Sequence, residues 1–264
     1  MEDLIGQGRT ADVFRYGEGK VIKVFHDEFA WLAYEEYAKV ISIDTIGVPA
    51  PQVYDFVDND GKKGIVYEYV KGVSMLNLMQ KSPYKIVRYA KLFADLHATI
   101  HKKTLASLPG VKESLSAMIL NVQSITQPEK DAIISYLNTL PDGNSLCHYD
   151  FHPDNVLLHN GSPKVIDWMA AGAGDPCVDV CRTGVILRSS TLPPGASANK
   201  AIMTNTFRKI FYRSYIRQYL KTTGAPMQNV DKWLLPVAAA RLAEGIESEA
   251  PYLHGIISKQ MAEF

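Results

Sequence analysis

Two stretches decide the fold: CHYDFHPDN, Cys147 to Asn155, and VIDW, Val165 to Trp168. The first contains two histidines, two aspartates and an asparagine, and the second places Asp167 among apolar neighbours. Phosphoryl transfer needs a base for a hydroxyl group and oxygen ligands for Mg²⁺, which binds only a few protein oxygens. The spacing therefore predicts Asp150 as the catalytic base and Asn155 and Asp167 as metal ligands.

Metal-dependent hydrolysis is an alternative for the same loop. His148, Asp150 and His152 alternate imidazole and carboxylate groups, which suits zinc or a two-metal hydrolase. The pair His97 and His101 has the spacing of two ligands on a helix, but Ala98 stands where a zincin helix carries glutamate. We therefore favour phosphoryl transfer, with His97 and His148 as buried hydrogen-bonding residues. A polar loop with structural histidines and no chemistry is a further alternative.

The motif pair resembles the catalytic loop and metal-binding motif of the aminoglycoside phosphotransferase and choline kinase superfamily, relatives of protein kinases. The upstream segment IGQGRTADVFRYGEGKVIKVF, residues 5–25, resembles their nucleotide-covering loop and the strands around it. The resemblance implies an α+β, two-lobed, protein-kinase-like fold. A small β-rich lobe over residues 1–71 would bind the nucleotide. A larger, mainly helical lobe over residues 72–264 would carry the catalytic loop and the acceptor site.

The same resemblance implies further site residues. Lys23 would hold the nucleotide phosphates and pair with Glu36, with Glu35 as the fallback. YEYVKG, residues 67–72, resembles the hinge, so the backbone of Glu68 and Val70 would bind adenine. Gly6 and Gly8 would form the nucleotide loop, although a third glycine is missing. The superfamily usually has glycine where this chain has Tyr149, and Asp175 and Asp179 match aspartates that we interpret as structural.

Composition limits the partners. The 264 residues carry no net charge at neutral pH, which favours neither nucleic acid nor a membrane surface. Three cysteines without metal-finger spacing fit reduced thiols, and the N-terminal residues lack a signal-peptide pattern, so we expect a cytoplasmic protein. One stripe, Phe207, Phe211, Tyr215 and Tyr219, alternates with basic residues and could be a binding face. At helical spacing it is better interpreted as a core face.

The pattern along the chain predicts strands before helices. Strands are expected within residues 4–25 and 52–70, separated by a helix over 27–43, with Gly72 as the lobe boundary. Short strands should flank the catalytic loop. Helices are expected over these ranges: 83–103, 127–140, 176–190, 197–223 and 229–260.

Together these features predict an ATP-dependent or GTP-dependent kinase that requires Mg²⁺ and phosphorylates a hydroxyl group of a small molecule. Aminoglycosides, amino alcohols and sugars are all candidate acceptors. On the expected C-terminal helix, Glu244 and Glu247 would share one face and could bind a cationic acceptor. The alternative is a pseudokinase that binds a nucleotide or scaffolds a partner; the presence of Lys23, Asp150, Asn155 and Asp167 favours the enzyme.

Overall fold

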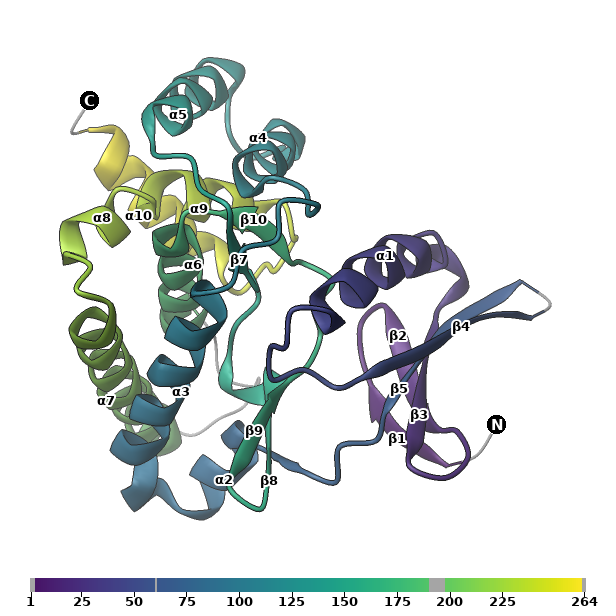
Figure 1. The fold of residues 1–264 in the computed structure, drawn as a ribbon. Coiled ribbons are helices and arrows are strands. Elements are labelled where there is room, and N and C mark those ends of the chain that lie inside the picture. The colour runs from purple at the N-terminus through teal and green to yellow at the C-terminus, as the bar shows by residue number, and fades with distance from the viewer. Residues whose placement is uncertain (1–2, 60, 190–197, 263–264) are drawn as a thin grey trace. The chain divides into compact units, whose positions relative to one another are not determined.

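The computed structural model describes residues 3–59, 61–189 and 198–262. The fold is α+β, with an antiparallel sheet in the N-terminal region and helices in the C-terminal region (Figure 1). The chain divides into two compact units: unit 1 is Met1–Asn77 with Asp154–Ala170, and unit 2 is Leu78–Pro153 with Ala171–Phe264. Unit 1 therefore extends past the expected boundary at Gly72 and also includes the segment that carries Asn155 and Asp167.

The main sheet of unit 1 has five antiparallel strands in the order β1-β2-β3-β5-β4. They are β1 (Leu4–Gln7), β2 (Ala11–Arg15), β3 (Lys20–Phe25), β4 (Val53–Asn59) and β5 (Lys62–Glu68). The β2–β3 turn contains Gly17 and Gly19 at φ 66° and 69°, a conformation that glycine adopts readily. This hairpin places β3, which carries Lys23, in the middle of the sheet, where Lys23 pairs with Ile65 of β5.

A single helix, α1 (Leu32–Asp44), packs against β4 and β5 of this sheet after a 3₁₀ turn, η1 (Asp27–Phe29). Its buried residues, Ala33, Glu36, Val40 and Ile43, recur every three or four positions. Glu36 is 1% exposed in this otherwise apolar row. A buried carboxylate needs partners, so Glu36 marks a site rather than a solvated face.

A smaller sheet completes unit 1, with strand order β6-β8-β9. Its strands are β6 (Val73–Ser74), β8 (Val156–His159) and β9 (Ser162–Val165). Asn160 and Gly161 connect β8 to β9 at φ 50° and 82°, the left-handed pair that a two-residue hairpin turn requires. The hairpin brings the segment around Asn155 alongside the segment around Asp167. The preceding turn, η3 (Pro153–Asn155), and the helix α2 (Met75–Lys81) adjoin this sheet in sequence.

Unit 2 is mainly helical, with a two-stranded sheet of β7 (Ser145–Cys147) and β10 (Gly172–Gly174). A short 3₁₀ turn, η2 (Pro83–Lys85), precedes α3. The helices are α3 (Ile86–His101), α4 (Val111–Asn121), α5 (Gln127–Thr139), α6 (Pro176–Ser189), α7 (Ala198–Thr223), α8 (Met227–Asp231), α9 (Leu234–Leu242) and α10 (Ala250–Met261). Helices α3 and α7 lie side by side and α6 packs against α7 (Figure 1).

The aromatic stripe on α7 faces the core. Phe211, Tyr215 and Tyr219 are at most 1% exposed. Phe93 of α3 contacts two of them, with ring centroids 5.4 Å from Phe211 and 5.3 Å from Tyr215. These three residues confirm the interpretation of the stripe as a core face, while the fourth, Phe207, is half-buried. It leaves the basic residues between the aromatics beside that face, so a nucleic-acid surface is not needed to explain the pattern.

The helix expected over residues 229–260 is wrong as a continuous element. The chain forms α8, α9 and α10, and the segment between Leu242 and Ala250 is not helical. Gly245 ends the run because it has φ 68°, a left-handed conformation common just after a helix. Glu244 and Glu247 therefore do not share a helix face, and the i,i+3 argument for a joint carboxylate site no longer holds.

Cys147, Cys177 and Cys181 are buried, and none of them forms a disulfide in the described part of the chain. Among the described residues, no helix combines the length and the apolar character needed to cross a bilayer.

The packing of Phe93 generates a stability prediction. Its ring is fully buried and stacks on Phe151 at 4.1 Å between ring centroids, in addition to its contacts with α7. Phe93→Ala should lower the free energy of unfolding by about 3–5 kcal/mol because it removes a large buried ring and leaves a cavity. Urea unfolding followed by far-UV circular dichroism measures the change.

The control is Tyr84→Ala, whose side chain is 80% exposed. It should change stability by less than about 0.5 kcal/mol. Equal effects of the two substitutions would contradict the assigned core.

Candidate active site

Lys23, Glu36 and Asp167 form an ionic cluster in unit 1. The Lys23 ammonium donates to Glu36 Oε1 and Oε2 at 3.0 and 2.8 Å and to Asp167 Oδ1 at 3.0 Å. Tyr67 of β5 donates its hydroxyl to Glu36 Oε1 at 2.8 Å. Lys23 thus meets the carboxylate expected from the sequence, Glu36 rather than Glu35, and a second one from a segment 144 residues away.

The opposite charges of this cluster stabilise one another and shift the pKa values of its members. Burial would lower the pKa of Lys23, but the carboxylates of Glu36 and Asp167 outweigh it and raise the pKa above its ordinary value. Burial, together with the nearby Glu36 charge, raises the pKa of the Tyr67 hydroxyl. Lys23 is therefore a permanent cation, and Tyr67 is a neutral donor that holds the Glu36 carboxylate in place.

Asp167 occupies a strained backbone position beside Asn155. Its φ is 64°, in the left-handed region that non-glycine residues rarely adopt. The adjacent Ile166 N donates to Asn155 O at 3.0 Å, as the β8–β9 pairing requires. Lys39 of α1 donates to Met169 O at 2.7 Å and holds the following segment. Such strain is common where a side chain is aimed for a function.

The oxygen donors on this segment suit Mg²⁺. Asp167 offers a carboxylate that is 42% exposed, and Asn155 offers an amide on a residue that is 8% exposed. Mg²⁺ prefers carboxylate and carbonyl oxygens and retains positions for water and phosphate oxygens. The donor set present therefore fits this ion.

The glycines and the hinge segment predicted to bind the nucleotide lie in unit 1, in and after β1 and at the end of β5. Gly8 N donates to Ala11 O at 2.9 Å in the β1–β2 turn, and a Cβ on Gly8 would lie 3.0 Å from that oxygen. Gly6 lies within β1. At the hinge, Glu68 N donates to Gln52 O at 2.9 Å, and Val70 O accepts from Gly72 N at 2.7 Å.

In unit 2, the backbone before Asp150 is held by Asp179 of α6. Asp179 Oδ2 accepts from His148 N at 2.6 Å, and Oδ1 accepts from Tyr149 N at 3.0 Å. Asp175 Oδ1 accepts from Cys177 N at 2.7 Å at the start of α6. Both aspartates thus have the contacts of the structural role inferred from the sequence, one at the start of a helix and one supporting the loop.

The donor atoms of His97, His101 and Asp179 lie within 4.8 Å of one another, a spacing that could hold a metal ion. Both imidazoles are already engaged: His97 Nδ1 is 2.8 Å from Tyr215 Oη, and His101 Nδ1 is 2.7 Å from Tyr219 Oη. Each Nε2 lies 3.2 Å from Asp179 Oδ2. Since Asp179 also accepts two backbone hydrogen bonds, this is better explained as a hydrogen-bonded support of the loop.

Asp150 lies close to positive and imidazole groups of unit 2. Its Oδ2 is 3.6 Å from His152 Nε2, and its backbone N donates to His148 Nδ1 at 3.2 Å. Burial would raise the pKa of Asp150, but His152, the charge of Arg182 and His148 outweigh it and lower the pKa below its ordinary value. The carboxylate is therefore ionised at neutral pH, the state that a general base requires.

The two C-terminal glutamates have different surroundings. Glu244 pairs with Arg182 of α6 and with Arg241 of α9, the latter at 2.5 Å, whereas Glu247 is exposed. The sequence reasoning missed Arg182, which is 3% exposed. A lone arginine in the apolar run PCVDVCRTGVIL, residues 176–187, was the signal that could have identified it, because a buried arginine requires a partner.

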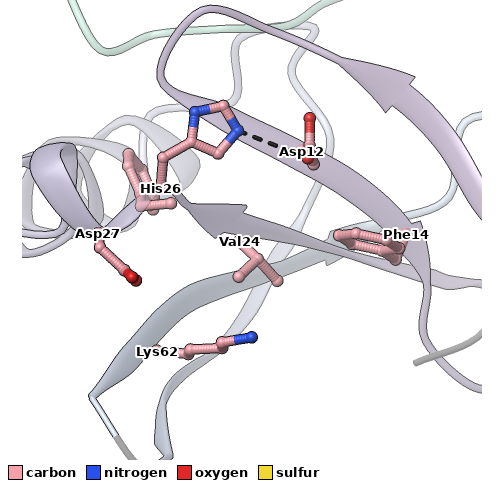
Figure 2. A pocket seen from close by; sticks show the side chains of 7 residues that line it. Asp12, Phe14, Val24, His26, Asp27 and Lys62 are labelled. Atoms are coloured by element: carbon pink, nitrogen blue, oxygen red, sulfur yellow. Dashed lines mark ion pairs between the residues drawn. The ribbon is translucent and has the colours of Figure 1, made fainter.

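A hollow of about 310 Å³ lies on the other face of the main sheet (Figure 2). Asp12 and Val24 are paired across β2 and β3, and His26 Nε2 lies 3.5 Å from Asp12 Oδ2. Because successive residues of a strand point to opposite faces, Val24 and Lys23 face opposite ways. Lys23, Glu36 and Asp167 are not among the residues that line the hollow. Its lining residues are Asp12, Phe14, Val24, Phe25, His26, Asp27 and Lys62.

The sequence matches the model of the phosphotransferase enzyme family over residues 4–225. The chain belongs to this family. Membership confirms the resemblance suggested by the two motifs and the predicted enzyme class, a phosphotransferase. No curated protein is significantly similar to this family member in sequence.

Solved structures confirm the kinase-like fold of this phosphotransferase family member. An aminoglycoside-3'-phosphotransferase of type VIII is 16% identical, with a TM-score of 0.63 over 92% of this chain and 90% of the other. The ADP-bound aminoglycoside phosphotransferase APH(2'')-Ib is 18% identical, with a TM-score of 0.58 over 97% and 90%. A choline/ethanolamine kinase family protein from Mesorhizobium loti is 17% identical, with a TM-score of 0.54 over 96% and 84%.

The shifted pKa of His97 predicts how the stability of the protein depends on pH. Burial, with the nearby His101, lowers the pKa of His97 from 6.5 to about 3, although Asp179 opposes the shift. Between these values the unfolded chain binds a proton that the folded protein excludes, so stability is lost as the pH falls from 6.5 toward 3. The expected slope from this group is about 1.4 kcal/mol per pH unit.

The measurement is urea unfolding at several pH values between 7 and 4, comparing the wild type with His97→Gln, which does not titrate. The plot of unfolding free energy against pH should be steeper for the wild type than for His97→Gln by that amount. Parallel curves would show that His97 is not held neutral by the fold.

Proposed function

We propose that the protein is an ATP-dependent kinase that requires Mg²⁺ and transfers the γ-phosphate to a hydroxyl group of a small molecule. The observation that supports it is the cluster in which Lys23 contacts both Glu36 and Asp167. Structurally similar proteins include an ADP-bound enzyme and a ternary complex with streptomycin and ATP. Loss of these charged groups would be expected in a pseudokinase, so the intact set favours an active enzyme.

On the nucleotide side, Lys23 would bind the α- and β-phosphates, with Glu36 and Tyr67 fixing its ammonium group. Gly6 and Gly8 would let the β1–β2 turn approach the phosphates closely.

The hinge bonds suggest how a base would be bound. Glu68 N and Val70 O are already used within the described residues, so a base would meet the Glu68 carbonyl and the Val70 N–H. An acceptor followed by a donor complements the amino group and ring nitrogen of adenine, which favours ATP over GTP.

On the metal side, Asn155 and Asp167 would be the protein ligands of Mg²⁺. When bound, Mg²⁺ neutralises phosphate charge and aligns the phosphates. The β8–β9 hairpin fixes the spacing of the two ligands, and Lys39 holds the backbone that follows Asp167. Lys23 would keep Asp167 oriented through its contact with Oδ1.

Asp150 would accept the proton of the acceptor hydroxyl. Its lowered pKa keeps it ionised at neutral pH, and the support of its loop by Asp179 limits the motion of its backbone.

Aminoglycosides, amino alcohols and sugar-like alcohols are the acceptor classes proposed. The carboxylate of Glu244 is largely neutralised by Arg182 and Arg241, which weakens its case as a ligand for an amine. Glu247 is the remaining carboxylate of the pair, and its exposure leaves it able to meet a cationic acceptor.

The proposed function is tested by a coupled ADP-release screen of the purified protein with Mg²⁺ and ATP. The acceptors are aminoglycosides, amino alcohols and sugars. At least one class should raise ADP release well above the rate with water alone. No stimulation by any class, in a protein that binds ATP, would favour a non-catalytic role.

Asp150→Asn should reduce phosphate transfer by a factor of a hundred or more while the affinity for nucleotide stays close to that of the wild type. The reason is that Asp150 would contact the acceptor rather than the nucleotide, and general-base catalysis contributes about 10²–10⁴-fold. The measurements are kcat with the best acceptor and the Kd of ATP by calorimetry. Turnover within a few fold of the wild type would rule out Asp150 as the base.

Asp167→Ala should abolish the gain in nucleotide affinity that Mg²⁺ confers, because it removes a charged metal ligand. Lys23→Met should weaken nucleotide binding both with and without Mg²⁺. Titrations of ATP in Mg²⁺ and in EDTA separate the two effects. A Mg²⁺-dependent gain that persists in Asp167→Ala would mean that another residue holds the ion.

A further inference from the structure

Arg182 of α6 contacts the residue that precedes the proposed base. Its guanidinium carbon lies 4.6 Å from the centroid of the Tyr149 ring, and its Nε donates to the Tyr149 carbonyl oxygen at 2.6 Å. The Tyr149 carbonyl belongs to the peptide group that leads directly into Asp150. The orientation of this peptide, and with it the direction of the Asp150 side chain, therefore depends on Arg182.

The contacts with Arg182 stabilise a strained backbone conformation at Tyr149. Tyr149 has φ 62°, a left-handed conformation that glycine adopts readily but that a bulky residue disfavours. Holding a non-glycine residue in this conformation costs about 1–3 kcal/mol. Asp179 holds the Tyr149 N–H on one side and Arg182 holds the carbonyl on the other. With the ring also stacked on the guanidinium, both peptide groups of this residue are fixed. The loop can then keep a conformation that its sequence disfavours.

The charge of Arg182 is balanced by Glu244, outside the loop. Arg182 pairs with Glu244, which also binds Arg241, and Arg241 donates to Glu249 at 2.8 and 3.1 Å. Two arginines and two glutamates thus form a largely buried chain from α6 to the start of α10, with Glu244 half-buried. Such pairing is what allows a guanidinium to remain in a site that is 3% exposed.

The charged groups that face Asp150 within unit 2 come from two elements. His152 and His148 belong to its own loop, and Arg182 belongs to α6. Arg182 carries a permanent positive charge.

We propose that Arg182 is a positioning residue for phosphoryl transfer: it fixes the peptide that leads into Asp150 and places a permanent positive charge near that carboxylate. The assignment rests on the proposed role of Asp150 as the base. It gives a function to Tyr149, whose ring is the surface on which the guanidinium is held. It also gives Glu244 the role of a counter-charge instead of an acceptor ligand.

The same helix offers a control in Arg188, which also stacks on a tyrosine but is exposed, whereas Arg182 is buried. Its guanidinium carbon lies 4.8 Å from the centroid of the Tyr212 ring, and its Nε donates to Gly184 O at 2.8 Å. It repeats the stacking and the carbonyl bond of Arg182, with partners on α6 and α7 instead of the loop before Asp150. Arg188→Met therefore reports the cost of removing a stacked arginine from α6.

Three variants test the role of Arg182. Arg182→Met removes the charge and the hydrogen bond but keeps much of the volume. Arg182→Lys keeps the charge and loses the planar donor. Because Arg182→Met leaves Glu244 short of a partner and could unfold, Arg182→Met combined with Glu244→Gln removes both charges together. Near-UV circular dichroism establishes which variants are folded.

The first measurement does not depend on turnover. Carbon-13 NMR of labelled aspartate, with the Asp150 signal assigned by its loss in Asp150→Asn, gives the pKa of that carboxylate. Arg182→Met should raise it by about 1 unit or more, since a nearby opposite charge lowers a carboxyl pKa by about 1–3 units. The double variant should also raise the pKa of Asp150, but by less than Arg182→Met alone. Arg182→Lys and Arg188→Met should leave the pKa of Asp150 within a few tenths of a unit of the wild-type value. All of these variants retain His152.

The second measurement is the pH dependence of kcat with the best acceptor from the screen. Arg182→Met should lower kcat about tenfold or more with the nucleotide KM unchanged, and should move the acidic limb to higher pH. Arg182→Lys should lower kcat without moving that limb. A merely structural arginine would lower stability and leave the limb in place.

An unshifted Asp150 titration in both folded variants that lack Arg182 would overturn the proposal. If the wild type phosphorylates no acceptor, the proposed function fails, while the NMR titration still decides whether Arg182 acts on Asp150. A shifted titration combined with normal kcat at every pH would also overturn the positioning role.

Discussion

Asp179 has no solvent around it, and an ionised carboxylate in that position costs several kcal/mol unless donors surround it. The fold supplies those donors from two directions: the backbone N–H groups of His148 and Tyr149, and the imidazole of His101. His97 Nε2 also lies 3.2 Å from Asp179 Oδ2. Burial would raise the pKa of Asp179, but these imidazoles lower it. The arrangement ties α3 and α6 to the loop before Asp150, so the position of the proposed base depends on one buried charge.

The histidines in turn depend on α7. Tyr215 and Tyr219 are four residues apart, as are His97 and His101, so two helices packed side by side place two hydroxyl groups against two Nδ1 atoms. The aromatic stripe, which resembles ordinary core packing, therefore also orients the two imidazoles that lie next to Asp179. Unit 1 uses the same principle on a smaller scale, because Tyr67 holds Glu36, Glu36 holds Lys23, and Lys23 holds Asp167.

Much of the fold could be predicted from the sequence because the signals were local. The β2–β3 hairpin follows from its turn residues, and α3, α6 and α7 follow from apolar periodicity. The choice of Glu36 over Glu35 rested on resemblance, and burial on one side of α1 supplies its physical reason. The C-terminal helix was overextended because the left-handed conformation of Gly245 breaks a pattern that periodicity alone would continue. The short helices α2 and α4 were missed for lack of a strong apolar repeat.

By itself, the sequence determined the class of chemistry, because a base, an amide and a carboxylate at fixed spacing in two motifs have few other uses. It also determined the α+β organisation through its two hydrophobic periods. Only the tertiary structure decided which charges meet. Arg182 and Glu244 are 62 residues apart and Lys23 and Asp167 are 144 apart, and no local pattern encodes such pairs. They form because buried charges must find partners, and the packing of α6 against α9 and of the strands around Lys23 determines which partners are within reach.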